Sequence, residues 1–379
     1  FVSEATKSIL KTDADKVLQY GPTEGYPPLI QQIIKRLAQK EGIHIKENEL
    51  LITTASQQGL DLVSKIFIDP GDIVIVEMPS YLGGLDALQS YGARFIGIPT
   101  DDDGMQVDIL AAKLKAMDKP QMSRIKLIYT VPDFQNPSGV TMSLNRREQL
   151  TALAEKYDLL ILEDTPYREL KYEGATLPSI FSIAGRSRVM MLYTFSKVFC
   201  PGMRLGFAIA GEQIIDKLVT AKQSTDLCTS PFNQALLCEM LKGGALDEHI
   251  GKIVSVYREK REFMLDTLDK YLTPLGLTDL KWTEPRGGLF LWLTLPDYMD
   301  TEEMLSRALQ KNVAYVIGSA FYHDRSVKNT MRLNFSYPSL EKISEGIKRL
   351  SELIEEEIKP STTIRHERTT YERKELNKI

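Results

Sequence analysis

Between about residue 50 and residue 210, short apolar runs rich in β-branched residues alternate with amphipathic segments of helical period. This alternation predicts an α/β domain in which a mainly parallel sheet is covered by helices on both faces. The expected strands are seven apolar runs: Leu50–Thr53, Asp72–Glu77, Arg94–Ile98, Arg124–Thr130, Leu159–Glu163, Val189–Thr194 and Leu205–Ala210. The helices expected between them repeat apolar residues every three or four positions: Gln57–Phe67, Leu82–Tyr91, Val107–Met117 and Arg146–Tyr157.

After Pro231 the pattern changes to one of longer helices and few strands. Helices are expected at Asn233–Leu241, Asp247–Tyr271, Glu302–Gln310 and Leu340–Ile358, and strands at Leu289–Leu293 and Met331–Phe335. A chain of 379 residues also exceeds the size at which one hydrophobic core usually suffices. We therefore predict a large domain over residues 1–271, a smaller α+β C-terminal domain over 272–360, and a polar tail over 361–379 that is solvated or frayed.

Composition narrows the class of partner. The 47 Lys and Arg residues nearly balance the 51 Asp and Glu residues, and no basic block is long enough to follow a nucleic-acid backbone, which favours a small-molecule partner over DNA or RNA. Three cysteines and four histidines show neither disulfide nor metal-site spacing. No signal peptide and no apolar stretch of about 20 residues is present, so we expect a cytoplasmic protein without a membrane partner.

The sharpest local signal lies at the end of the sixth predicted strand, where Thr194 and Ser196 are followed by Lys197 and then by Arg204. Open α/β sheets bind ligands at the carboxyl ends of their strands, and hydroxyl groups with an arginine suit a phosphate. Lys197 is therefore a candidate for forming an imine with a carbonyl ligand. A surface lysine after a strand would give the same local pattern.

Asp164 ends another apolar strand and should emerge at the same edge, with Tyr167 about one turn beyond it. A carboxylate beside a pyridine nitrogen favours the protonated ring, and each pKa unit of that preference corresponds to ~1.4 kcal/mol. The ring then accepts electrons more readily. An ordinary helix cap at Asp164 is the alternative.

Three further strand ends carry suitable side chains. Asn136 lies in a turn marked by proline and glycine, and Ser56 and Gln57 open a helix whose free N–H groups suit a phosphate. Tyr81 follows the next strand and could stack on an aromatic ring. A plain turn asparagine, a capped helix start and a half-buried tyrosine are the corresponding alternatives.

Taken together, these motifs resemble those of the class I aminotransferases, which are fold-type I enzymes dependent on pyridoxal 5′-phosphate (PLP). The resemblance extends over nearly all of residues 15–355 and is nearest to the 2-aminoadipate and aromatic or branched-chain branch. It implies the PLP-dependent transferase fold, with a seven-stranded sheet in the large domain.

The resemblance also implies roles for individual residues. Lys197, Asp164 and Tyr167 would be catalytic: Lys197 would hold PLP as a Schiff base and Asp164 would pair with the pyridine nitrogen. Tyr167 and Asn136 would hydrogen-bond the phenolic oxygen, with Asn136 also near the substrate, and Tyr81 would stack on the ring.

Other implied roles concern the phosphate, the substrate and the oligomer. The phosphate would be cradled by the backbone near Ala55 and by five side chains, those of Ser56, Gln57, Thr194, Ser196 and Arg204. Arg332 would bind the substrate α-carboxylate through its two-pronged guanidinium. Tyr20 resembles the tyrosine that reaches the phosphate site of a neighbouring subunit, which implies a homodimer with shared active sites.

The implied reaction moves an amino group from an L-amino acid to a 2-oxo acid, with 2-oxoglutarate as the expected acceptor. The chain departs from the family at three points. Ala55 stands where many relatives have glycine, and Thr225 stands where aspartate-specific relatives have arginine. The chain also begins inside what is normally the large domain, without the N-terminal arm. The absence of the arginine, together with the many apolar and aromatic residues, favours aromatic, branched-chain or 2-aminoadipate-like donors.

Two other functions are compatible with the same motifs. A PLP-dependent β-lyase uses the same groups, and GntR-type transcription regulators contain an aminotransferase-like half that binds an effector. The regulators carry a winged-helix domain ahead of this fold, and no such segment precedes it in this sequence. A nicotinamide dehydrogenase is disfavoured because no Gly-x-Gly-x-x-Gly follows a strand.

Overall fold

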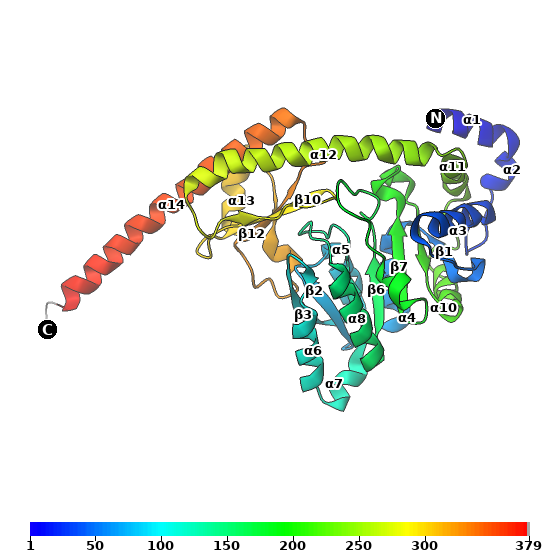
Figure 1. The fold of residues 1–379 in the computed structure, drawn as a ribbon, viewed down its shortest axis with the longest axis horizontal. Helices are drawn as coiled ribbons and strands as arrows, with labels where there is room; N and C mark the ends of the chain where they lie inside the picture. The colour runs from blue at the N-terminus through cyan, green and yellow to red at the C-terminus, as the bar shows by residue number, and fades with distance from the viewer. Residues whose placement is uncertain (377–379) are drawn as a thin grey trace. The chain divides into compact units, whose positions relative to one another are not determined.

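The computed structural model describes residues 1–376, and it describes side chains as far as Ile358. It contains two compact units (Figure 1). The large unit comprises Phe1–Val256 together with Pro285–Gly288, and the small unit comprises Tyr257–Glu284 and the chain from Leu289 onward. The predicted domain boundary near residue 272 stays a prediction. The predicted polar tail 361–379 lies outside the residues whose side chains are described.

The large unit is built on an eight-stranded sheet with the order β1-β8-β7-β6-β5-β2-β3-β4. Strands β7, β6, β5, β2 and β3 are parallel to one another, whereas β8 is antiparallel to both β1 and β7, and β4 is antiparallel to β3. The strands are β1 (Leu50–Thr53), β2 (Ile73–Met78), β3 (Arg94–Asp101), β4 (Gly104–Met105), β5 (Ile125–Thr130), β6 (Leu160–Asp164), β7 (Val189–Thr194) and β8 (Gly206–Ile209). All seven predicted strands are confirmed, and the predicted count falls one short because β4 is too short to show alternation.

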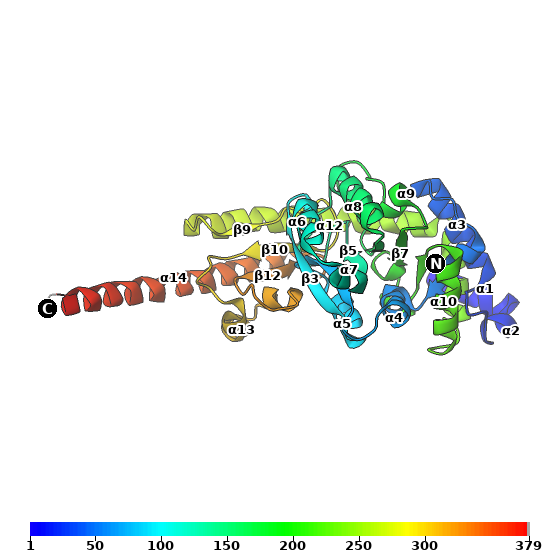
Figure 2. The ribbon, with the colours of Figure 1, turned by 90° about the horizontal axis from the view of Figure 1, so that it is seen from below.

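Helices cover both faces of this sheet, with α8 and α9 on one face and α4, α5 and α10 on the other (Figure 2). The helices of the large unit are α1 (Val2–Thr12), α2 (Ala14–Val17), α3 (Pro27–Glu41), α4 (Ala55–Phe67), α5 (Leu82–Ser90), α6 (Val107–Ala116), α7 (Lys119–Arg124), α8 (Leu144–Tyr157), α9 (Ile180–Ala184), α10 (Glu212–Gln223) and α11 (Pro231–Lys242). Short 3₁₀ helices lie at Glu47–Glu49 (η1), Phe195–Lys197 (η2) and Pro201–Met203 (η3). The predicted helices are confirmed as α4, α5, α6, α8 and α11.

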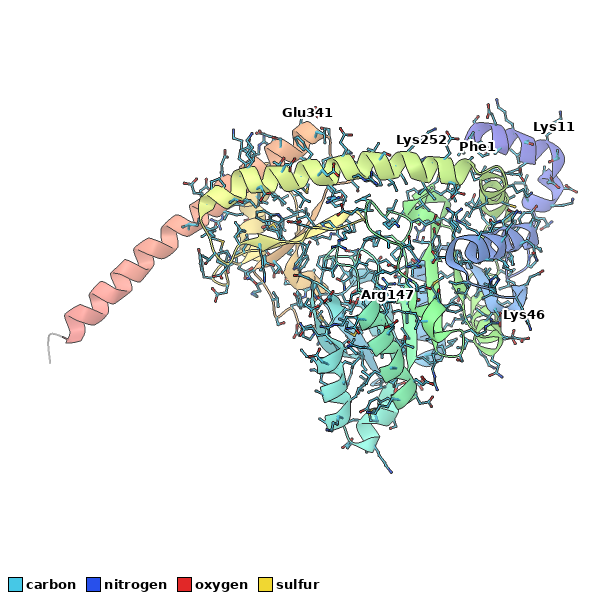
Figure 3. All side chains as sticks on the ribbon, in the orientation of Figure 1. Phe1, Lys11, Lys46, Arg147, Lys252 and Glu341 are labelled. Atoms are coloured by element: carbon cyan, nitrogen blue, oxygen red, sulfur yellow. The ribbon has the colours of Figure 1, made fainter. Side chains whose placement is uncertain are left out.

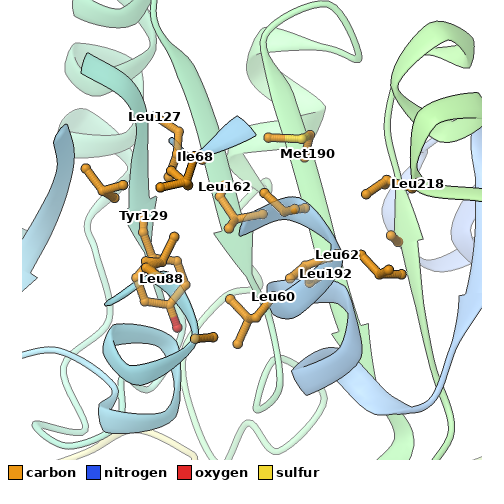
Figure 4. Packing of buried hydrophobic residues seen from close by; sticks show 14 of the residues in the cluster. Leu60, Leu62, Ile68, Leu88, Leu127, Tyr129, Leu162, Met190, Leu192 and Leu218 are labelled. Atoms are coloured by element: carbon orange, nitrogen blue, oxygen red, sulfur yellow. The ribbon is translucent and has the colours of Figure 1, made fainter. Parts of the chain in front are cut away.

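The core of the large unit forms where α4 meets the sheet. Leu60 and Leu62 of α4 are fully buried, and they belong to the same apolar cluster as Leu192 of β7 and Leu162 of β6 (Figure 4). Burying a leucine side chain contributes about 1.5–3 kcal/mol. The start of α4 is thus held against the carboxyl ends of the central strands.

The small unit contains a four-stranded antiparallel sheet with the order β11-β12-β10-β9. Its strands are β9 (Lys281–Trp282), β10 (Phe290–Thr294), β11 (Val316–Ile317) and β12 (Thr330–Asn334), and its helices are α13 (Thr301–Gln310), α14 (Leu340–Leu376), η4 (Thr273–Leu275) and η5 (Gly318–Phe321). Helix α12 (Ala245–Leu272) begins in the large unit and ends in the small one. The predicted strands are confirmed as β10 and β12, and the helix predicted to end at Ile358 continues to Leu376. Within residues 1–376, none of the helices combines the length and the apolar character that crossing a membrane requires.

The segment Pro285–Gly288 belongs to the large unit although the chain on either side of it belongs to the small one. The N–H of Gly288 donates to the carbonyl of Leu170 at 2.9 Å, and the N–H of Tyr172 donates to the carbonyl of Arg286 at 2.9 Å. These backbone hydrogen bonds attach the segment to the chain that follows β6.

Candidate active site

The strand ends that carry the predicted chemistry lie at one edge of the large sheet. Strands β2, β5, β6 and β7 are parallel, so their carboxyl ends share that edge. Gly206, at the start of β8, pairs with Thr53 at the end of β1 and with Thr194 at the end of β7. The start of β8 and the end of β1 therefore join the same edge.

Asp164 ends β6 and is 1% exposed. Its Oδ2 accepts a hydrogen bond from the hydroxyl of Tyr129 at 3.2 Å, and its Oδ1 is buried without a hydrogen-bond partner among the described residues. Burial raises the pKa of Asp164 to about 7, although the Tyr129 hydrogen bond and the positive charge of Lys197 oppose that rise. A buried carboxylate oxygen without a donor is costly, and a protonated ring nitrogen would supply the missing donor.

Lys197 is the last residue of η2, directly after β7, and it is half-buried. The turn before it is stabilised by Thr194, whose hydroxyl accepts the N–H of Ser196 at 3.2 Å and lies 3.0 Å from the Ser196 hydroxyl. Arg204 Nη1 donates to the same Ser196 hydroxyl at 3.3 Å. The structure therefore brings together Thr194, Ser196 and Arg204, three of the five side chains assigned from sequence to the phosphate.

The turn that leads into α4 has an unusual backbone conformation. Ala55 has a φ of 61°, in the left-handed region that favours glycine. A Cβ at Gly206 would lie 2.9 Å from the Ala55 backbone, so the close approach of these two segments requires glycine at 206. The turn thus adopts the left-handed conformation that the glycine of many relatives would adopt without strain at position 55. With alanine there, this conformation costs roughly 1–2 kcal/mol.

Gln57 and Tyr81 lie next to each other. The Tyr81 hydroxyl donates to Gln57 Oε1 at 3.3 Å, and Gln57 Nε2 donates to the carbonyl of Gly83 at 2.9 Å. Ser56, which precedes Gln57 in the first turn of α4, is half-buried. The first turn of α4 is therefore connected to the first turn of α5.

Asn136 lies in a buried loop after β5 and is 4% exposed. The loop is braced by Glu77 of β2, which accepts hydrogen bonds from the hydroxyl of Thr130 at 2.8 Å, from the N–H of Val131 at 3.0 Å and from Gln135 Nε2 at 2.8 Å. Burial raises the pKa of Glu77 to about 7, against these hydrogen bonds. The position of Asn136 thus depends on an acidic residue of the neighbouring strand.

The other side of this loop is held by buried arginines. Arg147 of α8, labelled in Figure 3, is fully buried and donates to Asp133 Oδ1 at 2.6 Å. It also donates to three carbonyls, those of Pro132 and Pro178 at 3.1 Å and that of Met142 at 3.0 Å. Arg168 donates to the second carboxylate oxygen of Asp133 at 2.9 Å. Asp133 is therefore an ionised, fully paired anchor for the loop.

Replacing Arg147 with methionine should lower the free energy of unfolding by about 3–5 kcal/mol, because Asp133 and three backbone carbonyls lose a donor. Urea unfolding of the purified variant measures this loss. Arg146→Met is the matched control, since the neighbouring Arg146 pairs with the more exposed Asp101 and Asp108 and should contribute less than about 1 kcal/mol. Equal losses in the two variants would contradict the anchoring role of Arg147.

The other residues of the large unit that were discussed for the site from sequence differ in how far their side chains are exposed. Tyr167, which follows β6, is 3% exposed, whereas Tyr20 is 77% exposed beside a hollow of about 400 Å³. Thr225 follows α10, and its hydroxyl donates to the carbonyl of Ala221 at 2.9 Å. Tyr20 thus presents its ring to the outside of this chain.

Arg332 lies in the small unit, on β12, where it pairs with Trp292 and Val316 of the adjacent strands. Its guanidinium carbon lies 4.0 Å from the centroid of the Phe290 ring and 5.3 Å from that of Phe321. Stacking on aromatic faces holds the planar guanidinium in one orientation.

Three residues that shape the site were not identified from sequence: Tyr129, Glu77 and Arg147. Each is a polar residue in or beside an apolar run, and a buried polar group needs a partner. That rule marks them as unusual, but the partner of Tyr129 is 35 residues away and that of Glu77 is 53 residues away or more. Only the order of the strands brings Tyr129 and Glu77 to these partners, whereas Arg147 of α8 binds the loop that directly precedes its helix.

Comparisons with known proteins agree with this geometry. The family described as aminotransferase class I and II matches residues 2–350. The chain is 47% identical over 358 residues to aromatic-amino-acid aminotransferase 1 of Thermococcus litoralis, an alignment that covers 94% of this chain and 85% of that protein.

Two crystal structures are similar along nearly the whole chain. Kynurenine aminotransferase of Pyrococcus horikoshii, in complex with PMP, KYN and KYA, is 46% identical with a TM-score of 0.89, and the match covers 94% of this chain and 87% of that one. The α-aminoadipate aminotransferase of Thermus thermophilus, complexed with N-(5′-phosphopyridoxyl)-L-leucine, is 38% identical with a TM-score of 0.85, over 93% of this chain and 87% of that one. The predicted fold and enzyme class are confirmed, and the chain belongs to the class I and II aminotransferase family.

Proposed function

We propose that this protein binds PLP at the carboxyl edge of the large sheet and uses it to transfer amino groups between amino acids and 2-oxo acids. The observation that carries the proposal is the buried Oδ1 of Asp164, which has no hydrogen-bond partner among the described residues. A protonated pyridine nitrogen would satisfy it. Tyr129 holds the other carboxylate oxygen, so the orientation of Asp164 is fixed before the cofactor binds.

The phosphate of PLP fits the surrounding groups. The first turn of α4 has no side-chain cap, so its N–H groups remain available to an anion. The hydroxyls of Ser56, Thr194 and Ser196 and the guanidinium of Arg204 complete the proposed cradle, with Gln57 beside it. In this arrangement Tyr81 would stack on the ring, and Tyr167 and Asn136 would hydrogen-bond the phenolic oxygen.

Bound PLP supplies an aldehyde for covalent attachment and a ring that accepts electrons. Lys197 would provide the amine for that attachment. Once a substrate amine has displaced it, Lys197 would take the proton from the substrate Cα and return it to the carbon that was the aldehyde carbon of the cofactor. Asp164, when ionised, would keep the ring nitrogen charged, and Tyr167 would orient the phenolic oxygen.

The proposed donors are aromatic, branched-chain or 2-aminoadipate-like L-amino acids, with 2-oxoglutarate as acceptor. The names of the relatives from Thermococcus litoralis and Thermus thermophilus support the aromatic and aminoadipate classes. The test is to mix the PLP-loaded protein with each of some twenty amino acids and to follow the conversion of cofactor absorbance to that of pyridoxamine phosphate. Formation of ammonia and pyruvate without pyridoxamine phosphate would contradict transfer and favour a β-lyase.

Arg332 would bind the substrate α-carboxylate. Replacing it with lysine removes the two-pronged geometry, so we expect KM to rise about 10–100-fold while the absorbance of the bound cofactor is unchanged. Steady-state kinetics with the preferred donor measures the effect. Arg349→Lys, at a half-buried position of α14 where the arginine pairs with Glu345, is the control; an unchanged KM for Arg332→Lys with every donor would exclude this role.

The proposed assembly is a homodimer with shared active sites, in which Tyr20 would contact the phosphate bound by the other subunit. The high exposure of Tyr20 supports this arrangement, because its ring is accessible to another subunit. Analytical ultracentrifugation of the purified protein tests it, and a monomer at micromolar concentration would contradict it.

A further inference from the structure

A lysine with no role in the proposed chemistry is fully buried beside the turn that precedes α4. Lys222 lies in the last turn of α10, and its side chain is 0% exposed. Its ammonium donates to Asp226 Oδ1 at 2.7 Å and to Gln58 Oε1 at 2.9 Å. Because desolvating a lysine is expensive, this arrangement needs both partners.

Both partners of Lys222 in turn hold Thr54. Gln58 Oε1 accepts the N–H of Thr54 at 2.8 Å, and Gln58 Nε2 donates to Asp226 Oδ2 at 2.6 Å. The Thr54 hydroxyl lies 3.1 Å from the same Asp226 oxygen and 3.1 Å from the hydroxyl of Thr229. The backbone and the side chain of Thr54 are therefore both fixed by one network.

The direction in which the Thr54 hydroxyl points has a consequence for anion binding. Thr54 is the N-cap residue of α4, and a threonine in that position ordinarily accepts an N–H of the first helical turn. Here its hydroxyl makes no such bond and is engaged by Asp226 and Thr229 instead. The N–H groups of the first turn of α4 are thereby left for another acceptor.

The charge of the network matters as well. Asp226 places a carboxylate beside the turn that would receive a phosphate, and two anions so close would repel each other. The buried ammonium of Lys222 compensates that carboxylate at 2.7 Å. The pair can hold Thr54 without adding net negative charge to the turn.

We propose that Lys222, Asp226 and Gln58 are positioning residues for the phosphate of the cofactor. They do not touch it; they hold the turn of Thr54 and Ala55 in the conformation that offers its N–H groups. This inference rests on the proposed PLP site.

The test compares PLP with pyridoxal, which lacks the phosphate. Cofactor-free protein is titrated with each compound, and the dissociation constants are read from the absorbance of the lysine-bound form. For Lys222→Met and Asp226→Asn we expect PLP to bind about tenfold more weakly or worse, while the affinity for pyridoxal changes less than about threefold. Lys217→Met and Asp216→Asn are the matched controls, because both residues are exposed on α10; they should leave both constants unchanged.

Thr54→Val covers the case in which a charge variant fails to fold, since it leaves the ion pair intact and removes only the hydroxyl. It should weaken PLP binding with little change for pyridoxal. Unchanged PLP affinity in the folded variants, or an equal loss for both compounds, would overturn the positioning role. If the unaltered protein binds neither compound, the proposed PLP site itself is wrong.

Discussion

Replacing Lys197 with alanine should lower the rate of amino-group transfer by at least about 10²–10⁴-fold, because the protein loses the amine that moves the proton. The loss extends to cofactor attachment, since no other lysine is placed after β7 at the carboxyl edge of the sheet among the described residues. The imine absorbance of the PLP-loaded protein should disappear. Borohydride reduction followed by peptide mass spectrometry should label Lys197 in the unaltered protein and leave the variant unlabelled.

A lysine on the outside of the same unit provides the control. Lys156 is exposed on α8, and Lys156→Ala should retain the full rate, the absorbance and the label. If borohydride does not label Lys197 in the unaltered protein, the proposed function is contradicted. A Lys197→Ala variant that still forms a reducible imine at another position would show that the amine is supplied from elsewhere.

Replacing Asp164 with asparagine should lower kcat about 100-fold or more while PLP still binds. Asparagine keeps the shape and the contact with Tyr129 but removes the negative charge that holds a proton on the ring nitrogen. A neutral ring accepts electrons less well, so removal of the substrate proton slows. Single-turnover mixing with the preferred donor, followed by absorbance, separates this step from cofactor binding.

The same substitution should change how the stability of the cofactor-free protein depends on pH. In the folded protein the pKa of Asp164 is raised to about 7, whereas in the unfolded chain it is ordinary for aspartate, about 3.9. Between these values the folded state binds more protons than the unfolded one, so the free energy of unfolding falls as pH rises, by up to about 1.4 kcal/mol per pH unit.

Asp164→Asn removes this contribution, and only the dependence caused by other groups such as Glu77 remains. Urea unfolding of the cofactor-free variant and of the unaltered protein at pH 5 and pH 7.5 measures the difference. Parallel stability profiles for the two proteins would contradict a raised pKa at Asp164. Asp216→Asn, an exposed change on α10, should leave the profile unaltered.

The regular part of the fold follows from local patterns. Runs of four to eight apolar residues bounded by polar turns identify β1 and β7 with the residues at which they begin and end. Strands of two residues such as β4 are too short to show a period. Helix α3 was not among the predicted helices, although its sequence contains signals for it. Pro27 lies in its first turn, and Gly42 has the left-handed conformation at its end.

The candidate site was predictable to the extent that its residues follow strands. Asp164 ends an apolar strand and Lys197 follows another by three residues, and parallel strands bring such ends to one edge. The network of Lys222 could not be predicted in this way, because Gln58 is 164 positions away from it. Its members meet only after α4 and α10 have packed side by side, and local sequence patterns contain no signal for that packing.

The segment Pro285–Gly288 determines how this protein can be dissected. A gene that stops after Val256 would omit a piece of the large unit, and Tyr172 would lose its backbone acceptor at Arg286. Gly288, whose left-handed backbone lies against Phe134 in the loop that carries Asn136, would be missing too. The large unit is thus a discontinuous domain, and to be produced alone it would need those four residues grafted back through an artificial linker.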